Sequence, residues 1–504
     1  MTQGQRIFRN AAALLVSQPL TWALTLVFTV IVPRNVGPSE WGEWVIAGSV
    51  TSVAAAVFDF GLNTVLFKEV ARGPANASRL LGTVLTARLA LLPLLAAGVL
   101  GFGHLAGYSG HTLVILSLIT LSLLVSYVCR PAAFGLMAFE KMHVNALANV
   151  LTGLIQTVVA VLLVKFFALG IISISVVAFC ANVLGLALQW AWLGRQVRLR
   201  PVFDPNLIRQ LFTAGLPYWA TQLFFTVYVW VDGIILSVAV SQAEVGWYGV
   251  GAQIISTLGF LPYVVTTVVF PELSRSFHQD QDRTAVLAGR SFRLLVTLGV
   301  PTAAGLALVA EPLVRAIYGD WFAPAGAPLT LLALTLLPVY AATLVNAFII
   351  AADRQVQWTG VMGAMCVINP VINMVTIPYF HAHQGNGALG AAVALLVTDI
   401  LTGVVALVLL PGALRHAVAA SAPAVLRSLL ATAVMAAAVW PLRWFFLPIP
   451  VLAGATTFGA CALVLRVFPP DELRLMASFA GRPLTRLLRR GGRAQPTSGA
   501  EPAT

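Results

Sequence analysis

Residues 10–32 read NAAALLVSQPLTWALTLVFTVIV and contain no charged side chain. A helix that crosses a bilayer needs about 20 consecutive, mostly apolar residues, so this stretch predicts a membrane-spanning helix. Arg6 and Arg9 precede it, but the run is too long for the core of a signal peptide, and no small-residue cleavage site follows it. We therefore expect the segment to remain as the first span.

Further apolar runs of similar length follow along the whole chain. The expected spans cover residues 10–32, 41–60, 80–101, 112–138, 144–164, 168–193, 211–240, 245–270, 291–314, 324–350, 356–378, 387–411, 425–441 and 444–467. Hydrophobic residues make up 59% of the sequence and charged residues only 10%, far below the roughly 25% of a soluble domain. The sequence predicts an all-α polytopic membrane protein with about 14 transmembrane helices.

The basic residues alternate between the two sides of these spans. Of the 30 Lys and Arg, 24 lie on the side of the predicted spans that holds the N-terminus. Four lie on the opposite side (Arg34, Lys165, Arg315 and Arg443), and Arg88 and Arg130 lie within spans. Short cytoplasmic loops of membrane proteins carry an excess of Lys and Arg. Both termini are therefore predicted to be cytoplasmic.

Charge and cysteine usage exclude other classes of protein. The net charge of +12 does not indicate nucleic acid as a partner, because these charges lie in short loops and a tail where they contact anionic lipid headgroups. Cys129, Cys180, Cys366 and Cys461 lie singly in predicted spans, without the spacing of a disulfide framework or metal site. We expect no metal and no cofactor.

Weak internal symmetry divides the chain into halves. Glu40-Trp41-Gly42 opens the second span and Glu244-Val245-Gly246 the eighth, and Ala168-Leu169-Gly170 and Ala388-Leu389-Gly390 open the sixth and twelfth. Such repeats are typical of transporters that rock two halves around a central site. We predict two pseudo-symmetric six-helix lobes plus two C-terminal helices.

The predicted domain boundaries follow from this symmetry. The N-terminal lobe covers residues 1–200, the C-terminal lobe 201–415 and an additional two-helix hairpin 416–468. Residues 469–504 are expected to begin as a basic amphipathic surface helix and to end disordered. This tail reads as a membrane anchor, with docking of glycan-assembly proteins as the alternative.

Polar residues predict which helices face the seam between the lobes. Ser17, Thr21, Thr25 and Thr29 repeat every four residues in the first span and form one polar stripe, although such hydroxyls also bond their own helix and pack helices closely. In the seventh and eighth spans, Gln222 and Gln253 supply amides for the same seam.

Several motifs together resemble the multidrug/oligosaccharidyl-lipid/polysaccharide exporter superfamily. They are Asp59-Phe60-Gly61-Leu62, the amphipathic Leu66-Phe67-Lys68-Glu69-Val70-Ala71-Arg72, Leu216-Pro217 with Asp232, Val245-Gly246-Trp247-Tyr248 leading into Phe270-Pro271-Glu272-Leu273-Ser274, Asn346 with Ala351-Ala352-Asp353-Arg354, and Gly387-Ala388-Leu389-Gly390-Ala391. The resemblance covers roughly residues 5–470 and is best to bacterial O-antigen and capsular polysaccharide translocases.

That resemblance implies a flippase of the bacterial inner membrane rather than an enzyme. Its substrate would be a polyprenyl-diphosphate-linked oligosaccharide, moved from the cytoplasmic to the outer leaflet for surface polysaccharide biosynthesis. A polar seam open to lipid suits a glycan and a diphosphate that cannot cross hydrocarbon. No Gly-Lys-Ser/Thr triplet occurs, so the phosphate-binding loop of ATP-hydrolysing transporters is absent, and we expect alternating access without ATP hydrolysis.

Other functions are compatible with parts of the sequence. A cation-coupled multidrug exporter of the same superfamily lacks the last two spans, and lipid II flippases carry an arginine-rich first helix, whereas no Arg lies between Asn10 and Val32. A membrane glycan polymerase or acyltransferase needs a long outward loop or clustered catalytic His and Arg. His104, His111, His381 and His383 lie near outward connections and read as ordinary loop residues.

Two arginines are the candidates for binding the diphosphate that the resemblance implies. Arg88 and Arg130 lie nine residues after Arg79 and ten before Glu140, which puts both ~14–15 Å from the cytoplasmic face, near the midplane. A basic group at that depth needs a partner or a water-filled cavity. A structural pair with Asp59 is the alternative role.

The remaining site predictions concern carboxylates and amides. Asp232 and Asp399 lie deep in their spans, where they would bind a cation or carry a proton; a salt bridge within one lobe is the alternative. Gln222, Gln253 and Asn346 are expected to hydrogen-bond the diphosphate and the first sugars, or else to bond neighbouring helices.

Overall fold

The computed structural model describes residues 3–197, 202–277, 279–352 and 354–467, and within these ranges the regular structure is entirely helical. The helices are α1 Gln3–Val36, α2 Pro38–Val57, α3 Leu62–Arg72, η1 Pro74–Asn76, α4 Ala77–Leu105, α5 Gly110–Ala138, α6 Met142–Phe167, α7 Ile171–Gly194, α8 Pro205–Ala239, α9 Gln242–Leu258, α10 Phe260–Ser276, α11 Gln281–Tyr318, η2 Asp320–Ala325, α12 Gly326–Ala351, α13 Gln355–Gln384, α14 Gly387–Leu409, α15 Gly412–Ala419, α16 Ala422–Val439, η3 Trp440–Leu442 and α17 Pro448–Val464.

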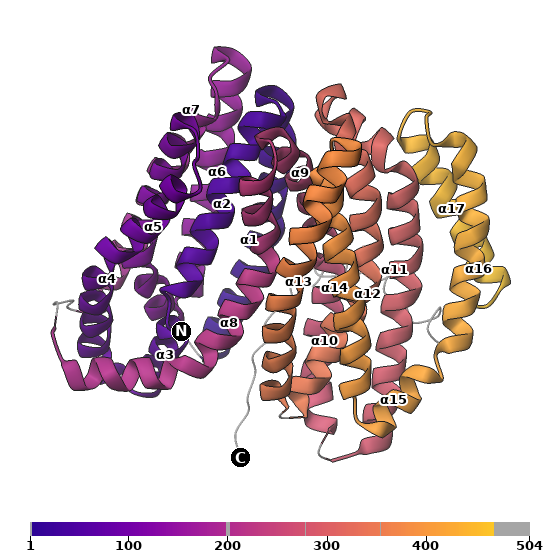
Figure 1. The fold of residues 1–504 in the computed structure, drawn as a ribbon. Coiled ribbons are helices and arrows are strands. Elements are labelled where there is room, and N and C mark those ends of the chain that lie inside the picture. The colour runs from indigo at the N-terminus through magenta and orange to yellow at the C-terminus, as the bar shows by residue number, and fades with distance from the viewer. Residues whose placement is uncertain (1–2, 198–201, 278, 353, 468–504) are drawn as a thin grey trace, which may run out of the picture.

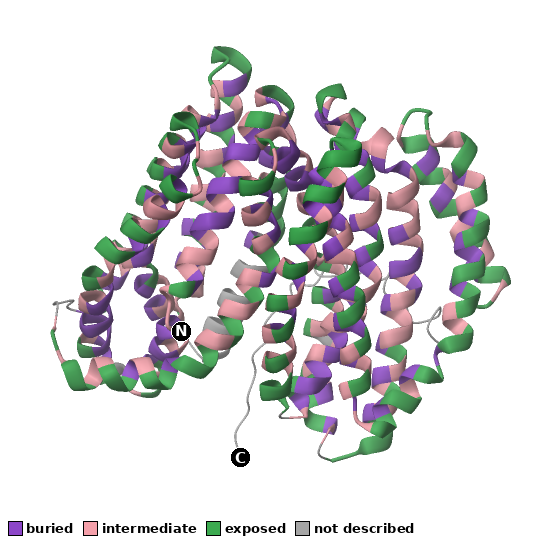
Figure 2. Cartoon of the chain, viewed as in Figure 1, coloured by how far each residue is buried: buried purple, intermediate pink, exposed green. Residues whose placement is uncertain are grey.

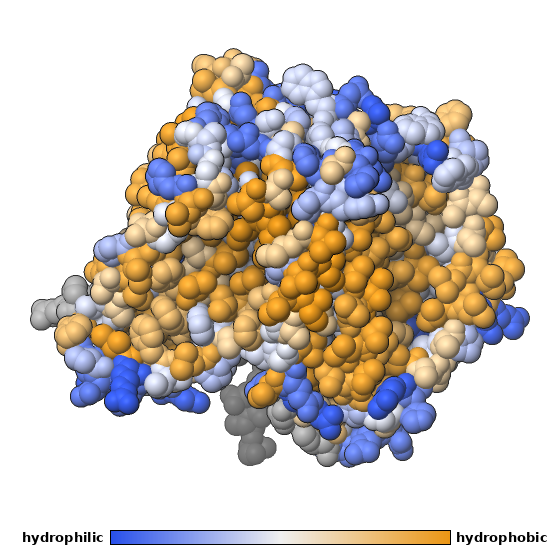
Figure 3. Space-filling view, viewed as in Figure 1, coloured by the Kyte–Doolittle hydropathy of each residue, from blue (hydrophilic) through white to orange (hydrophobic). Residues whose placement is uncertain are grey.

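Length and hydropathy make this a multi-pass membrane protein. Among the described residues, 12 helices are long and apolar enough to cross a membrane, and the pair α2 and α3, bent by 51°, adds a thirteenth. The apolar helix α17, at 17 residues, is shorter than these candidates, so the count of candidate spans is close to the predicted 14. Figure 3 shows an apolar band between two polar ends, and we conclude that the predicted fold class is confirmed.

The pattern of buried and exposed residues also fits a membrane protein. Buried residues concentrate where helices face one another, whereas outward faces are exposed (Figure 2). Large apolar side chains such as Leu94, Val371 and Leu452 are more than half exposed. A bilayer covers such surfaces with hydrocarbon, so these side chains mark the lipid-facing sides of their helices.

The helices fall into two groups on either side of a seam. In Figure 1, α4, α5 and α7 lie on one side and α11, α16 and α17 on the other, with α8, α9 and α13 between them. Helix α8 bonds to both groups: Trp219 Nε1 donates to the carbonyl of Ala56 at 3.0 Å, and the hydroxyls of Thr221 and Thr359 lie 2.9 Å apart.

The two glutamates of the repeated sequence make equivalent contacts. Glu40 in α2 accepts the backbone N–H of Ile171 at the start of α7, at 2.8 Å. Glu244 in α9 accepts the N–H of Gly387 at the start of α14, at 2.6 Å. A carboxylate at a helix N-terminus satisfies an otherwise unpaired donor. These matched caps support our proposal of two related lobes.

Of the proposed domain boundaries, the structure describes only the one at 415/416. The division at 200/201 and the tail 469–504 lie outside the described residues. The division at 415/416 falls within α15, and α16 and α17 then form an antiparallel hairpin beside α11.

The two groups meet closely at the end of the molecule drawn at the top of Figure 1, which we call the distal end; the predicted topology puts it outside the cytoplasm. A Cβ atom on Gly42 would lie 1.8 Å from the carbonyl oxygen of Gln242, and one on Gly246 would lie 2.1 Å from that of Pro38. Only glycine permits this crossing of α2 and α9.

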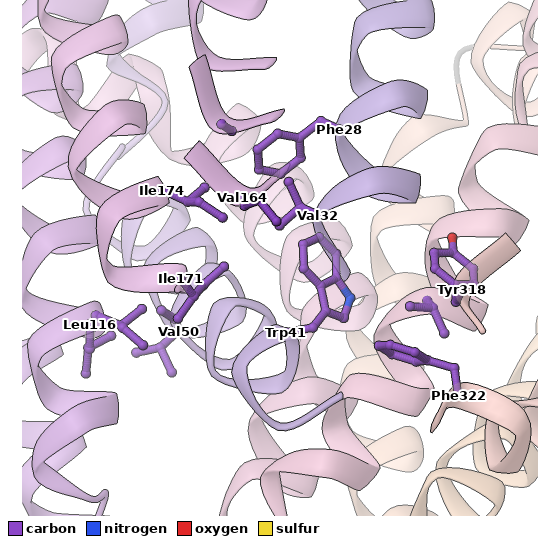
Figure 4. Packing of buried hydrophobic residues seen from close by; sticks show 14 of the residues in the cluster. Phe28, Val32, Trp41, Val50, Leu116, Val164, Ile171, Ile174, Tyr318 and Phe322 are labelled. Carbon is purple, nitrogen blue, oxygen red and sulfur yellow. The ribbon is translucent and has the colours of Figure 1, made fainter. Parts of the chain in front are cut away.

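An apolar cluster seals the same end. Buried residues from the first group, such as Phe28, Val32 and Trp41, share one core with Tyr318 and Phe322 of the second. Figure 4 shows Trp41 lying between Val32 and Phe322. Apolar burial of this kind contributes roughly 25 cal/mol per Å², so this packing stabilises the closed arrangement of the distal end.

We expect valine at Gly42 or Gly246 to separate α2 from α9, because the clash is with backbone that cannot rotate away. A cysteine introduced at Phe322 of a cysteine-free variant should then react severalfold faster with a membrane-impermeant thiol reagent. Gly98→Ala is the matched control, since nothing lies within 4 Å of its added carbon. Unchanged labelling would contradict the assignment of this crossing as the distal closure, and a cysteine at buried Leu136 reports whether the fold persists.

Candidate functional site

A cavity of about 700 Å³ lies between α2, α3, α4, α5 and α8. We call it the polar cavity because three ionisable groups, Asp59, Arg88 and Arg130, line it together with Gln222. Its remaining polar lining consists of Asn63 and of hydroxyl-bearing side chains: Thr51, Ser52, Thr64, Ser122, Ser126, Tyr127 and Thr226. The cavity therefore brings together three of the predicted substrate-binding residues, Arg88, Arg130 and Gln222.

The break between α2 and α3 places Asp59 inside the bundle. Gly61 has φ of 69°, in the left-handed region, and a Cβ there would lie 2.2 Å from the carbonyl oxygen of Gly215 in α8. A glycine is required on both counts. The chain turns at this point, and the Asp59 carboxylate faces α4 rather than the membrane surface.

Arg88 is completely buried, and both of its terminal nitrogens bond to neighbouring groups. Its guanidinium donates to Asp59 Oδ1 at 3.0 Å, to Asn63 Oδ1 at 2.9 Å and to the carbonyl of Tyr127 at 2.6 Å, and it lies 4.7 Å from the centre of the Tyr127 ring. Asn63 in turn donates to Asp59 at 2.5 Å. These contacts match the structural pairing with Asp59 that the sequence left open.

Arg130 has a different environment although it lies at a similar predicted depth. It is exposed in α5, lines the polar cavity, and makes no hydrogen bond or salt bridge within the described part of the chain. Across the cavity, Gln222 in α8 is also exposed, and among the described residues its amide donates only to Thr226, at 3.2 Å. Arg130 thus presents an unpaired cation to any anion that enters.

A second cavity of about 450 Å³ lies next to the first, between α1, α2, α6, α8 and α9. We call it the aromatic chamber, because Phe28, Trp41, Trp44, Trp230 and Tyr248 line it. Its polar lining consists of Thr25, Thr29, Ser49, Gln156, Thr157, Gln253 and Ser256. Gln253 is therefore at the seam but apart from Arg130.

The hydroxyls of the first span serve both of the roles considered from sequence. Thr21, Thr25 and Thr29 each donate to the carbonyl four residues earlier, at 2.8–2.9 Å, so they bond their own helix. Thr25 and Thr29 nevertheless line the aromatic chamber.

Asp232 lies in a buried polar cluster between α8, α9 and α13. Its two carboxylate oxygens accept from Tyr248 Oη at 2.6 Å and Asn373 Nδ2 at 2.7 Å, and Asn373 also donates to Asn369 at 2.8 Å. The residue is 1% exposed. Among the described residues it has no basic partner, so the salt-bridge alternative finds no support at this position.

Asp399 is linked to the same cluster. It accepts a hydrogen bond from Tyr228 Oη at 2.5 Å, and the neighbouring Thr398 accepts one from Asn369 at 3.2 Å. The two predicted carboxylates are thus joined by a continuous path of buried polar groups through α13. Within the described ranges, no three His, Cys, Asp or Glu side chains gather as a metal site.

Asn346 lies apart from these groups. It belongs to α12 and lines neither cavity, and its buried Oδ1 accepts no hydrogen bond from the described residues. Two histidines also differ from their interpretation as ordinary loop residues. His111 contacts buried Glu43 at 2.6 Å, and His381 contacts buried Glu244 at 3.0 Å, so both help to hold the distal end.

Sequence reasoning missed several residues of the site. Asn369 and Asn373, four residues apart in α13, share one helix face, and this spacing was the available signal. Tyr228 and Tyr248 read as ordinary aromatic residues of a span, and Gln156 belongs to a helix that no motif singled out.

Comparison with known proteins identifies the family. A model of the family described as polysaccharide biosynthesis protein matches residues 7–277, which is more than half of the chain. The probable flippase AglR of Haloferax volcanii is 27% identical over 405 residues, covering 76% of this chain and 79% of the relative.

Solved structures of transporters share the fold. The lipid II flippase MurJ in an inward closed conformation aligns with a TM-score of 0.69 and 15% identity, over 91% of this chain and 99% of that chain. An inward-facing multidrug resistance MATE family transporter of the MOP superfamily aligns with a TM-score of 0.60 and 12% identity, over 76% and 92%. The chain belongs to the polysaccharide biosynthesis protein family, and its fold is that of these solved transporters.

Proposed function

We propose that the protein flips a polyprenyl-diphosphate-linked oligosaccharide from the cytoplasmic to the outer leaflet of a bacterial inner membrane, for surface polysaccharide biosynthesis. The observation that carries the proposal is the unpaired Arg130 in a polar cavity within a membrane-spanning bundle. A cation held at that depth is costly unless it serves a ligand or a water-filled space. Both termini lie in the cytoplasm in this proposal, so the distal end faces outward.

Arg130 and Gln222 bind the diphosphate in this proposal. Arginine suits phosphate because its planar guanidinium donates two parallel hydrogen bonds. Arg88 acts through Asp59: by fixing that carboxylate and Asn63, it holds the break between α2 and α3 and keeps the cavity wall in place. Gln253 contributes from the aromatic chamber, and Asn346 stays a more remote candidate because it lines neither cavity.

Transport is coupled to a cation or proton at Asp232, with Asp399 as the second carboxylate. Asn373 Oδ1 is buried and accepts no hydrogen bond from the described residues. Asn373 Nδ2 lies between the Asp232 carboxylate and Asn369 Oδ1, and a change in the rotamer of this amide would turn the free oxygen toward them, giving the oxygen ligands that hard cations prefer. Tyr228, Tyr248 and Thr398 hold this cluster in position.

Reconstitution into liposomes tests the proposal directly. Without ATP, purified protein is expected to move a fluorescent polyprenyl-diphosphate-linked oligosaccharide between leaflets. The share of substrate in the outer leaflet is measured by oxidation of its glycan, or by binding of a lectin, with a reagent added outside the liposomes. Lipid II and an organic cation such as tetraphenylphosphonium serve as competing substrates. Transport of the organic cation with no movement of the lipid-linked glycan would contradict the proposal and favour a multidrug exporter.

A further inference from the structure

The aromatic chamber has a composition of its own. Trp41 and Trp44 stack with ring centres 6.5 Å apart and planes at 16°, and Phe28 lies 5.7 Å from Trp44. Trp230 lines the chamber from α8, 37% exposed. The chamber therefore offers aromatic surface from α1 and α2 of the first group and from α8, which lies between the groups.

Among the residues that the structure describes, no Asp, Glu, Lys or Arg lines this chamber, whereas the neighbouring polar cavity holds Asp59, Arg88 and Arg130. A charged ligand group placed here would lose its hydration without gaining a counter-ion. The chamber thus suits an uncharged part of a ligand, and the phosphate belongs to the polar cavity.

Amide groups in the chamber are available to a ligand. Gln156 makes no hydrogen bond within the described part of the chain, and the amide of Gln253 donates only to Ser256, over 3.4 Å. An amide both donates and accepts, which matches a ring that carries several hydroxyls. Aromatic faces with a few placed polar groups are the usual composition of a pocket for such a ligand.

The two spaces are arranged in series. Trp230 lines both, and α2 gives Ser49 to the chamber and Ser52 and Ala56 to the polar cavity. Ser49 and Ala56 are about 10 Å apart along a regular helix. A headgroup whose phosphate contacts Arg130 therefore extends past Trp230 into the chamber if it enters glycan first.

We propose that the aromatic chamber is a sugar subsite, which takes the neutral sugars beyond the phosphate-linked one, with Trp44 and Trp230 packing against ring faces and Gln156 and Gln253 bonding hydroxyls. This inference rests on the proposed function and adds a specificity site to it. The glycan then occupies the end nearest the distal closure, and the lipid remains beside the polar cavity.

The test compares two substrates, a polyprenyl-diphosphate-linked oligosaccharide and its truncation to one sugar. Trp44→Ala and Gln156→Leu are expected to lower the apparent affinity for the oligosaccharide roughly tenfold or more while leaving transport of the one-sugar lipid unchanged, because only the longer glycan reaches the chamber. The one-sugar lipid also reports that each variant is folded. Trp444→Ala, exposed and outside both cavities, is the matched control.

Other outcomes separate failure of the subsite from failure of the function. Equal losses for both substrates, or none for either, would overturn the sugar subsite while wild-type transport still supports a flippase. If Trp44→Ala impaired only transport of tetraphenylphosphonium, the chamber would be a cation-binding cage and the inference would be wrong. Wild-type protein that moves neither lipid would overturn the proposed function itself.

Discussion

Replacing Arg130 with alanine is expected to reduce flipping of the lipid-linked oligosaccharide by about 100-fold or more. Removing one partner of a desolvated, hydrogen-bonded charge pair costs about 2–5 kcal/mol, and each 1.4 kcal/mol is a factor of ten. The loss should be the same for long and truncated glycans, because both carry the diphosphate. The measurement is the initial flipping rate in liposomes at matched protein content.

The fold should survive this change. Arg130 is exposed and holds no partner among the described residues, so its truncation leaves no buried charge behind. Arg130→Lys keeps the charge but not the bidentate geometry and should retain part of the activity. Arg72→Ala is the control, since Arg72 pairs only with Glu69 on the surface. Normal flipping by Arg130→Ala would show that the diphosphate is bound elsewhere.

Arg88→Ala in the same assay provides the contrast. Here the change strands Asp59 beside Asn63 in the interior, and leaving one member of a buried pair unpaired costs about 3–5 kcal/mol. The expected result is a lower yield of folded protein, not a folded protein that fails to bind. Loss of flipping by a folded Arg130→Ala protein, together with a low yield of folded Arg88→Ala protein, would distinguish a residue that binds the substrate from one that supports the cavity wall.

The sequence predicted the helical architecture because membrane spans depend on local composition. An apolar run of sufficient length forms a helix whatever its neighbours, since backbone polar groups have no other partner in hydrocarbon. The predicted second span shows where this reasoning becomes less exact. Hydropathy continues through Asp59, Phe60 and Gly61, but the chain breaks there and turns by 51°.

The site was predicted less completely, because depth is only one of the coordinates that place a side chain. Arg88 and Arg130 are equivalent in depth, yet packing turns Arg88 toward Asp59 and leaves Arg130 open to the cavity. Rotation about the helix axis depends on contacts between helices far apart in sequence. The same reason explains why Asn346 lines neither cavity and why Gln156 gave no signal.

Replacing Asp232 with asparagine is expected to remove the stimulation of flipping by an imposed Na⁺ or pH gradient, while slow flipping down the substrate gradient continues. Asparagine has the same shape and keeps one oxygen that can accept from Tyr248, so we expect the fold to be retained while the charge and the hydrogen bond from Asn373 are lost. Both oxygens of Asp232 accept hydrogen bonds, and each keeps a further lone pair that can take a proton or contact a cation. The Na⁺ and pH arms of the measurement distinguish these two forms of coupling. Asp399→Asn should weaken the stimulation less, because Asp399 reaches the cluster only through Tyr228 and Thr398.

Asp204→Asn is the control, since that carboxylate caps α8 and pairs with Arg79 away from the buried cluster. Full gradient dependence in the Asp232→Asn protein would exclude coupling through this carboxylate, and the buried asparagines of α13 would then have a purely structural role.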